Sequence, residues 1–147
     1  MKYAKGIGIF LAVVFAAAPA FAHHMAVVVD KDNHLSEVSS AHLAKMFRGE
    51  SKKWPDGRDV AIVLHRSSPT EALTLEHLTG MSAQEWNALV EAHKSSIVFV
   101  DSDADVLKEV ATKPGSIALV EVRAINDQVN VLKVNGQLPM ETGYLPH

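Results

Sequence analysis

The sequence contains no cysteine. This absence excludes disulfide bonds, thiolate ligands for a metal and a cysteine nucleophile. A small secreted module held together by disulfides is therefore excluded, and the fold must depend on a hydrophobic core. The Gly-x-Ser-x-Gly elbow of serine hydrolases is also missing. We predict no catalytic role and no cofactor for this chain.

An excess of basic residues is missing as well. The chain has 14 Lys and Arg against 17 Asp and Glu. A protein that binds nucleic acid or an anionic membrane surface normally presents a basic face. The charge balance therefore argues against both kinds of partner.

Residues 1–22 have the features of a secretory signal peptide. Two lysines near the start precede an apolar core, and Ala20 and Ala22 are the small residues that a signal peptidase requires. Cleavage after Ala22 leaves residues 23–147, which carry 12 bases and 17 acids, a formal charge of −5. We predict export to a bacterial periplasm, one domain over residues 23–147, and no membrane span after cleavage.

A strand, a helix and the polar segment between them organise the mature chain. We call this segment, residues 65–71 including the first turn of the helix, the elbow. Residues 60–64 are a continuous aliphatic run, which is typical of a strand buried on both faces. The next helix is marked by Ser68 at the N-cap, Pro69 at its first position and Gly80 just past its end. In open α/β sheets, ligands bind beyond the carboxyl ends of strands, where helix N-termini attract anions. Arg66 lies at this place.

Other strands and helices alternate along the chain. Strands are predicted over residues 25–29, 97–100, 116–122 and 129–134, and helices are predicted to begin at Ser39 or Ser40, at Ser82 with a capping box to Glu85, and within Asp101–Asp103, where Asp103 would be the cap. Trp54 is expected to pack back against the domain. This alternation predicts an α/β fold with a mixed, mostly parallel sheet and helices on both faces.

Four segments of the chain resemble the substrate-binding proteins of phosphate ABC transporters. They are residues 43–57, with a helix ending in Phe-Arg-Gly and then Trp-Pro-Asp-Gly, residues 60–66, residues 78–86, and residues 110–118 with their Pro-Gly-Ser-Ile. The resemblance implies a type II periplasmic-binding-protein fold, in which two lobes normally close on an oxyanion. The mature length leaves room for a single lobe of this kind.

The resemblance also implies an anion site at the elbow. Arg66 would supply a bidentate fork, Ser67, Ser68 and Thr70 would supply hydroxyls, and the helix its positive dipole end. Full-length phosphate binders carry roughly Arg-x-Asp-Gly-Ser-Gly-Thr here, and this chain lacks both glycines and the acid. The expected ligand is inorganic phosphate or another small oxyanion, held at most by a weakened site.

The same elbow also fits a plain helix cap. Residues 68–71 read Ser-Pro-Thr-Glu, a capping box in which Glu71 would take the N-cap amide and place a negative charge where the anion should bind. Two such charges repel by about 1 kcal/mol in water and by more when partly buried. The alternative function is therefore a periplasmic protein-interaction or sensory module that lost its ligand, with a transporter or sensor protein as partner. A homodimer could supply the missing wall of the cleft.

The histidines predict no metal site inside the domain. They fall on different predicted elements without the spacing of metal ligands. The pair His23 and His24 is different, because cleavage would give His23 a free α-amine that can chelate Cu(II) or Ni(II) together with an imidazole. The other interpretation of this pair is a tolerated polar start of the mature chain.

The predicted cleavage is directly testable. Mass spectrometry of the periplasmic protein should find His23 at the N-terminus, because Ala20 and Ala22 satisfy the signal peptidase. An intact chain that starts at Met1 and is recovered with the membrane fraction would contradict the prediction.

Overall fold

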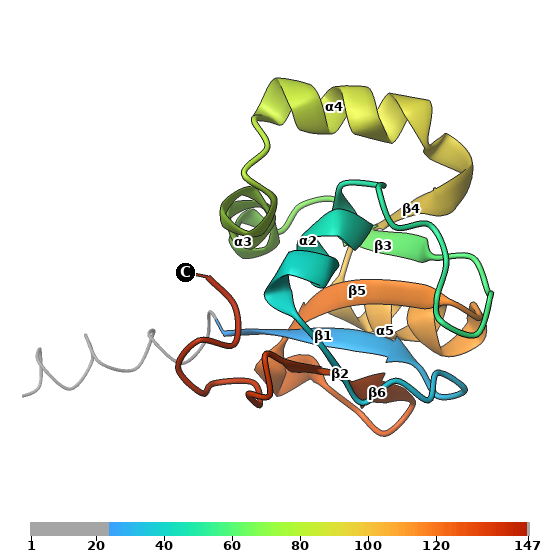
Figure 1. Ribbon diagram of the computed structural model, residues 1–147, viewed down its shortest axis with the longest axis vertical. Coiled ribbons are helices and arrows are strands. Elements are labelled where there is room, and N and C mark those ends of the chain that lie inside the picture. The colour runs from blue at the N-terminus through green and yellow to red at the C-terminus, as the bar shows by residue number, and fades with distance from the viewer. Residues whose placement is uncertain (1–23, 147) are drawn as a thin grey trace, which may run out of the picture.

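The computed structural model describes residues 24–146 (Figure 1). The predicted signal peptide and His23 lie outside this range. Its elements are β1 (Met25–Asp30), β2 (Glu37–Val38), α2 (Ser40–Phe47), β3 (Ala61–His65), α3 (Pro69–Thr79), α4 (Ala83–Ala92), η2 (Lys94–Ser96), β4 (Ile97–Val100), α5 (Asp103–Thr112), β5 (Ser116–Glu121), η3 (Val122–Ala124), β6 (Val129–Val131) and β7 (Lys133–Val134). Within this range no helix has the length and apolar character needed to cross a membrane.

The main sheet has five strands in the order β4-β3-β5-β1-β6. β3 pairs in parallel with β4 and β5, whereas β1 pairs antiparallel with β5 and β6. β1 therefore runs against the other four strands, and the predicted mixed, mostly parallel sheet is confirmed. β2 and β7 form a separate parallel pair.

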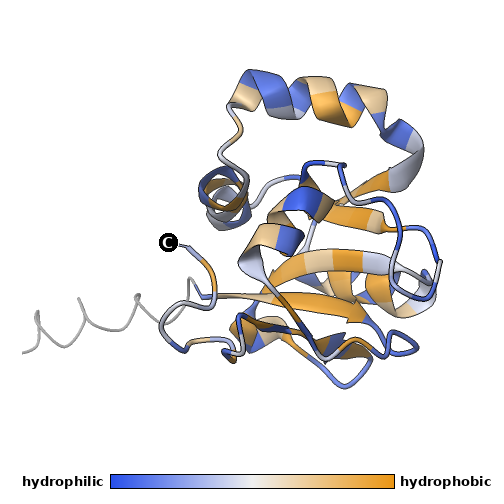
Figure 2. Cartoon of the chain, in the orientation of Figure 1, coloured by the Kyte–Doolittle hydropathy of each residue, from blue (hydrophilic) through white to orange (hydrophobic). Residues whose placement is uncertain are grey.

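Helices cover both faces of this sheet, as the sequence predicts. Every residue of β1 is buried, and successive side chains enter two different cores. Val27 and Val29 pack with the apolar residues of α2 and α3, whereas Val28 packs with those of α5. Figure 2 shows this as apolar strands between helices whose outer sides are hydrophilic.

Most helix boundaries agree with the local sequence signals. Ser39 caps α2, and the capping box at α4 is complete, because Ser82 Oγ accepts from Glu85 N at 3.2 Å and Ser82 N donates to Glu85 Oε1 at 3.4 Å. The prediction that Asp103 caps α5 is wrong. Ser102 is the cap, and its Oγ accepts from Asp105 N at 3.1 Å. The carboxylate of Asp103 is engaged elsewhere.

The strand predicted over residues 129–134 divides at Leu132 into β6 and β7. Leu132 N still donates to Val27 O of the main sheet, whereas Lys133 N donates to Ser36 O beside β2. The chain therefore passes from one sheet to the other at this residue. Tyr144 fixes the crossing point, since its buried hydroxyl accepts from Val27 N at 3.0 Å and donates to Leu132 O at 2.6 Å.

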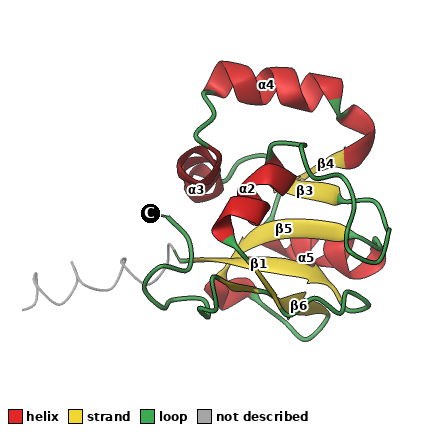
Figure 3. Cartoon of the chain, in the orientation of Figure 1, coloured by secondary structure: helices red, strands yellow, loops and turns green. Residues whose placement is uncertain are grey.

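Helix α4 stands away from the sheet and reaches β4 through η2 (Figure 3). None of its residues is buried. Trp86 and Val90 are partly buried and pack against the core on the side of α2. Its C-terminal end lies close to the turn after α2, because a Cβ at Gly49 would lie 3.1 Å from Leu89 Cδ1. The helix is thus an arch on this side of the domain and contacts it through Trp86, Leu89 and Val90.

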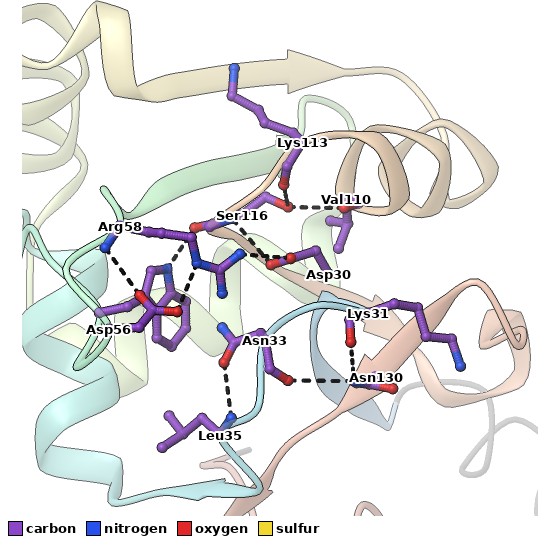
Figure 4. Close-up of polar contacts among 12 residues, drawn as sticks. Asp30, Lys31, Asn33, Leu35, Asp56, Arg58, Val110, Lys113, Ser116 and Asn130 are labelled. Atoms are coloured by element: carbon purple, nitrogen blue, oxygen red, sulfur yellow. Dashed lines mark hydrogen bonds and ion pairs between the residues drawn. The ribbon is translucent and has the colours of Figure 1, made fainter.

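The backbone N–H and C=O of Gly115 join three parts of the chain. Gly115 N donates to Asp30 Oδ1 at 3.1 Å, and Gly115 O accepts from Trp54 Nε1 at 2.7 Å and from Ala61 N at 3.0 Å. Trp54 is therefore buried against the domain as expected. Figure 4 shows Arg58 beside the same Asp30, which accepts from Arg58 Nη1 at 3.0 Å.

Gly115 should tolerate no side chain. Its φ is +80°, and a Cβ would lie only 2.2 Å from the backbone oxygen of Asp59. Gly57 is a matched control, because its φ is +90° but nothing lies within 4 Å of a Cβ there. Gly115→Ala should lower the free energy of unfolding by about 1–3 kcal/mol more than Gly57→Ala does, as measured by urea denaturation. Equal losses would contradict the close contact.

Candidate anion site

The elbow lies at the carboxyl end of β3, as predicted. β3 ends at His65, Ser68 is the N-cap of α3, and Ser68 Oγ accepts from Glu71 N at 3.2 Å. Pro69 is the first helical residue, and Gly80 ends the helix with a φ of +69°. The positive end of the α3 dipole therefore points at the segment that carries Arg66.

Arg66 is held by the neighbouring strand β4 and the loop after it. Its Nη1 lies 2.8 Å from Asp101 Oδ1, and its guanidinium carbon lies 5.7 Å from the centre of the Phe99 ring. The side chains of Arg66 and Asp101 are 58% and 68% exposed. An ion pair this exposed contributes about 0–1 kcal/mol, so an incoming oxyanion can compete with Asp101 for the arginine.

The three predicted hydroxyl residues lie in different settings. Ser67 is exposed, Ser68 is half-buried and its hydroxyl is used by the helix cap, and Thr70 is half-buried in the first turn of α3. The backbone oxygen of Thr70 accepts from Thr74 Oγ1 at 2.9 Å. The fold thus brings all four predicted residues to one elbow, with Arg66 and Ser67 toward solvent.

Glu71 does not complete the predicted capping box. Its carboxyl is buried, and Oε2 accepts from His65 N at 2.8 Å, while Ser68 N donates to His65 O. The reason lies in the sheet. The pairing of β3 with β5 ends at Val63, so the next amide on that side, His65 N, has no strand partner and takes the carboxyl instead. Oε1 has no hydrogen-bond partner among residues 24–146.

The pKa of Glu71 is raised to about 8, mainly by burial; the hydrogen bond from His65 N lowers it and the nearby Asp103 carboxylate raises it. The Glu71 side chain is therefore mostly uncharged at neutral pH. The repulsion between Glu71 and a bound anion, which the sequence predicts, is thereby largely removed below pH 8.

Two acids that follow β4 complete the elbow, Asp101 in the loop and Asp103 at the first position of α5, and neither was predicted to belong to it. Besides Asp101 on Arg66, Asp103 Oδ1 lies 3.1 Å from His65 Nδ1, and Asp103 Oδ2 accepts from Glu121 N at 3.3 Å. Both acids follow the carboxyl end of β4, which runs parallel to β3. Their position after a predicted parallel strand was the sequence signal that could have placed them near the elbow. In the part of the chain that the structure describes, no group of three His, Asp or Glu side chains could hold a metal ion.

Comparison of the sequence with protein-family models and with curated proteins finds no match. Comparison of the fold with solved structures finds several matches. An ABC-type phosphate transport receptor from Vibrio cholerae matches with a TM-score of 0.65 and 14% identity over 79% of this chain and 48% of that one. A putative phosphate ABC transporter substrate-binding protein with bound phosphate from Clostridium perfringens matches with a TM-score of 0.65 and 16% identity over 78% and 46%. PstS from Borrelia burgdorferi matches with a TM-score of 0.64 and 17% identity over 79% of this chain and 49% of that one.

The chain has the fold of one lobe of these receptors. It spans about half the length of the phosphate receptors that it matches. The predicted resemblance and the predicted single lobe of a periplasmic-binding-protein fold are therefore confirmed. The matched proteins are transport receptors and binding proteins rather than enzymes.

The buried carboxyl predicts an unusual pH dependence of stability. The pKa of Glu71 rises from its ordinary value of 4.5 to about 8 on folding. Between these pH values the folded protein keeps a proton that the unfolded chain has released, so stability falls as the pH rises. One pKa unit corresponds to about 1.4 kcal/mol. Relative to that of Glu71→Gln, the free energy of unfolding of the wild type should fall by a few kcal/mol, an order-of-magnitude figure, between pH 5 and pH 8.

Denaturant unfolding of both proteins across this pH range measures the difference. Glu76→Gln is the control, because Glu76 lies exposed on the same helix and its removal should leave the pH dependence of the wild type unchanged. Parallel curves for wild type and Glu71→Gln would show that Glu71 is already ionised in the folded protein at pH 5.

Proposed function

We propose that this protein is an exported, non-catalytic solute-binding protein that acts in the periplasm and holds inorganic phosphate or another small oxyanion weakly at the elbow. One observation carries the proposal. The exposed guanidinium of Arg66 follows the carboxyl end of β3 and precedes the N-terminus of α3, an 11-residue helix. Parallel strands and helix N-termini of α/β proteins bind anions at this position.

The contacts at the elbow explain why binding would be weak. A bound oxyanion has to displace Asp101 from Arg66, and the Ser68 hydroxyl is already engaged by the helix. A single lobe also offers one wall of a cleft, whereas closed sites bury about 70–90% of a small ligand. Arg66 and the exposed Ser67 hydroxyl remain as the direct contacts, assisted by the dipole of α3.

Glu71 would make this binding dependent on pH. Its carboxyl lies in the first turn of α3 and is mostly protonated at neutral pH, because its pKa is raised to about 8. An anion at the elbow disfavours ionisation of Glu71, so by linkage the affinity should fall as the pH rises through 8.

The alternative is a protein-interaction or sensory module without a ligand. Its support is that groups of the chain itself pair with the polar groups of the elbow. His65 N donates to the Glu71 carboxyl, and Arg66 forms an ion pair with Asp101. The partner would be a transporter or sensor protein, or a second copy that supplies the missing wall. Phe99, which is 37% exposed on the edge strand β4, would then belong to the contact surface.

Calorimetry with phosphate distinguishes the two functions. The wild type should bind at pH 6.5, and Arg66→Ala should remove the signal, since a charge-assisted contact contributes about 1.5–3 kcal/mol. Lys94→Ala is the control, because Lys94 likewise forms an exposed pair with a carboxylate, Glu91, and lies before the amino end of β4, away from the elbow. Sulfate, titrated in parallel, tests the choice of oxyanion.

The pH dependence adds a second criterion. Phosphate affinity should decline between pH 6.5 and pH 9 in the wild type and decline less in Glu71→Gln. Glu71→Gly should strengthen binding at high pH, because it removes the carboxylate. The absence of heat with any oxyanion at millimolar concentration, before and after Glu71→Gly, would refute the oxyanion site and leave the interaction module.

A further inference from the structure

A cavity lies at the amino ends of the strands whose carboxyl ends carry the elbow. Its volume is about 420 Å³, and it is lined where the three parallel strands begin: by Ala61 and Ile62 of β3, by Ser95 and Ser96 before β4, and by Lys113 before β5. Its size falls within the 300–1,000 Å³ that is common for ligand pockets. No residue of the elbow lines it.

Most of the polar side chains that line this cavity are donors, and the other two are those of His93 and Asp59. The side chains of Lys52, Lys113, Ser51, Ser95 and Ser96 line the cavity, and none of them has a hydrogen-bond or ion-pair partner in residues 24–146. Lys52 and Lys113 line the same cavity, and an anion bound there would attract both of them. Five unpaired side chains of this kind match the head group of an anionic ligand.

The single acid of the lining does not neutralise these lysines. Asp59 forms its ion pair with Lys53, and its side chain is 82% exposed. Lys113 is likewise separate from the Asp30 network, since Figure 4 shows its side chain pointing away from Asp30. The cavity therefore keeps a positive charge, although the whole chain is acidic.

The remaining wall is apolar. It consists of Met46, Ile62 and Ile97 from the core and of Leu89 from the arch helix α4. Leu89 lies close to Gly49 in the turn after α2, so this part of α4 forms one side of the cavity. A bare inorganic anion would leave such a surface without a partner, whereas a hydrocarbon or aromatic body would cover it.

We propose that this cavity is a binding site for a small organic acid, with its carboxylate between Lys52 and Lys113 and its apolar body against Met46, Ile62 and Leu89. The site is independent of the elbow, because it lies at the other ends of the same strands and shares no residue with it. It adds to the proposed oxyanion binding and does not depend on it.

Titration of the isotope-labelled protein with hexanoate and benzoate, followed by NMR, tests the proposal. The methyl signals of Ile62, Leu89 and Ile97 should shift with saturation, and hexanamide and benzamide, which match in shape but carry no charge, should bind at least 10-fold more weakly. The double variant Lys52→Gln/Lys113→Gln should lose carboxylate affinity by at least 10-fold. Lys108→Gln, an exposed lysine of α5 outside the cavity, should not.

Cross-titration separates this site from the elbow. Arg66→Ala should keep carboxylate binding, and the double lysine variant should keep whatever phosphate binding the wild type has. Because both lysines are unpaired, the double variant should retain the wild-type pattern of backbone signals, which shows that it is folded. Absence of methyl shifts at millimolar acid, equal binding of acid and amide, or unchanged binding in the double variant would each overturn the proposal.

Discussion

The structure depends on the backbone N–H and C=O of one residue, Gly115. Its N–H and C=O bind three segments that are distant in sequence: the end of β1 through Asp30, the start of β3 through Ala61, and the polar loop through Trp54. These bonds fix where β5 begins between its neighbours and therefore set the register of the central sheet. The residue must be glycine, because φ is positive and the backbone of Asp59 leaves no room for a side chain.

With that register, different side chains gather at the carboxyl ends and at the amino ends of the central strands. At the carboxyl ends of β3 and β4, acids of the chain balance Arg66 and His65, and Glu71 fills the amide that β5 leaves unpaired. At the amino ends of these strands, Lys52 and Lys113 line a cavity, and neither forms an ion pair within residues 24–146. The chain thus pairs more of its own polar groups at the carboxyl ends of these strands than at their amino ends.

Local signals in the sequence were sufficient for much of the fold. Ser68, Gly80 and the Ser82 capping box act within one helical turn, so their roles follow from neighbouring residues alone. One error is local, because Ser102 and not Asp103 caps α5. The others concern long-range pairing. Glu71 turns to His65 N only because β5 pairing stops at Val63, and Asp101 reaches Arg66 only because β4 lies beside β3. Neither fact is encoded near the residues concerned, and the same holds for the contact of Tyr144 with β1 and for the lining of the cavity.

The arch formed by α4 has a consequence for the local opening of the chain. Because α4 buries none of its residues and leans on the core through Trp86 and Val90, few apolar contacts are lost when it unwinds. Its amides should exchange with deuterium well before those of β1 and β5. A protease would cut between residues 83 and 92 first, and the two fragments would stay together through the sheet, since β3 and β4 remain paired on either side of the cut.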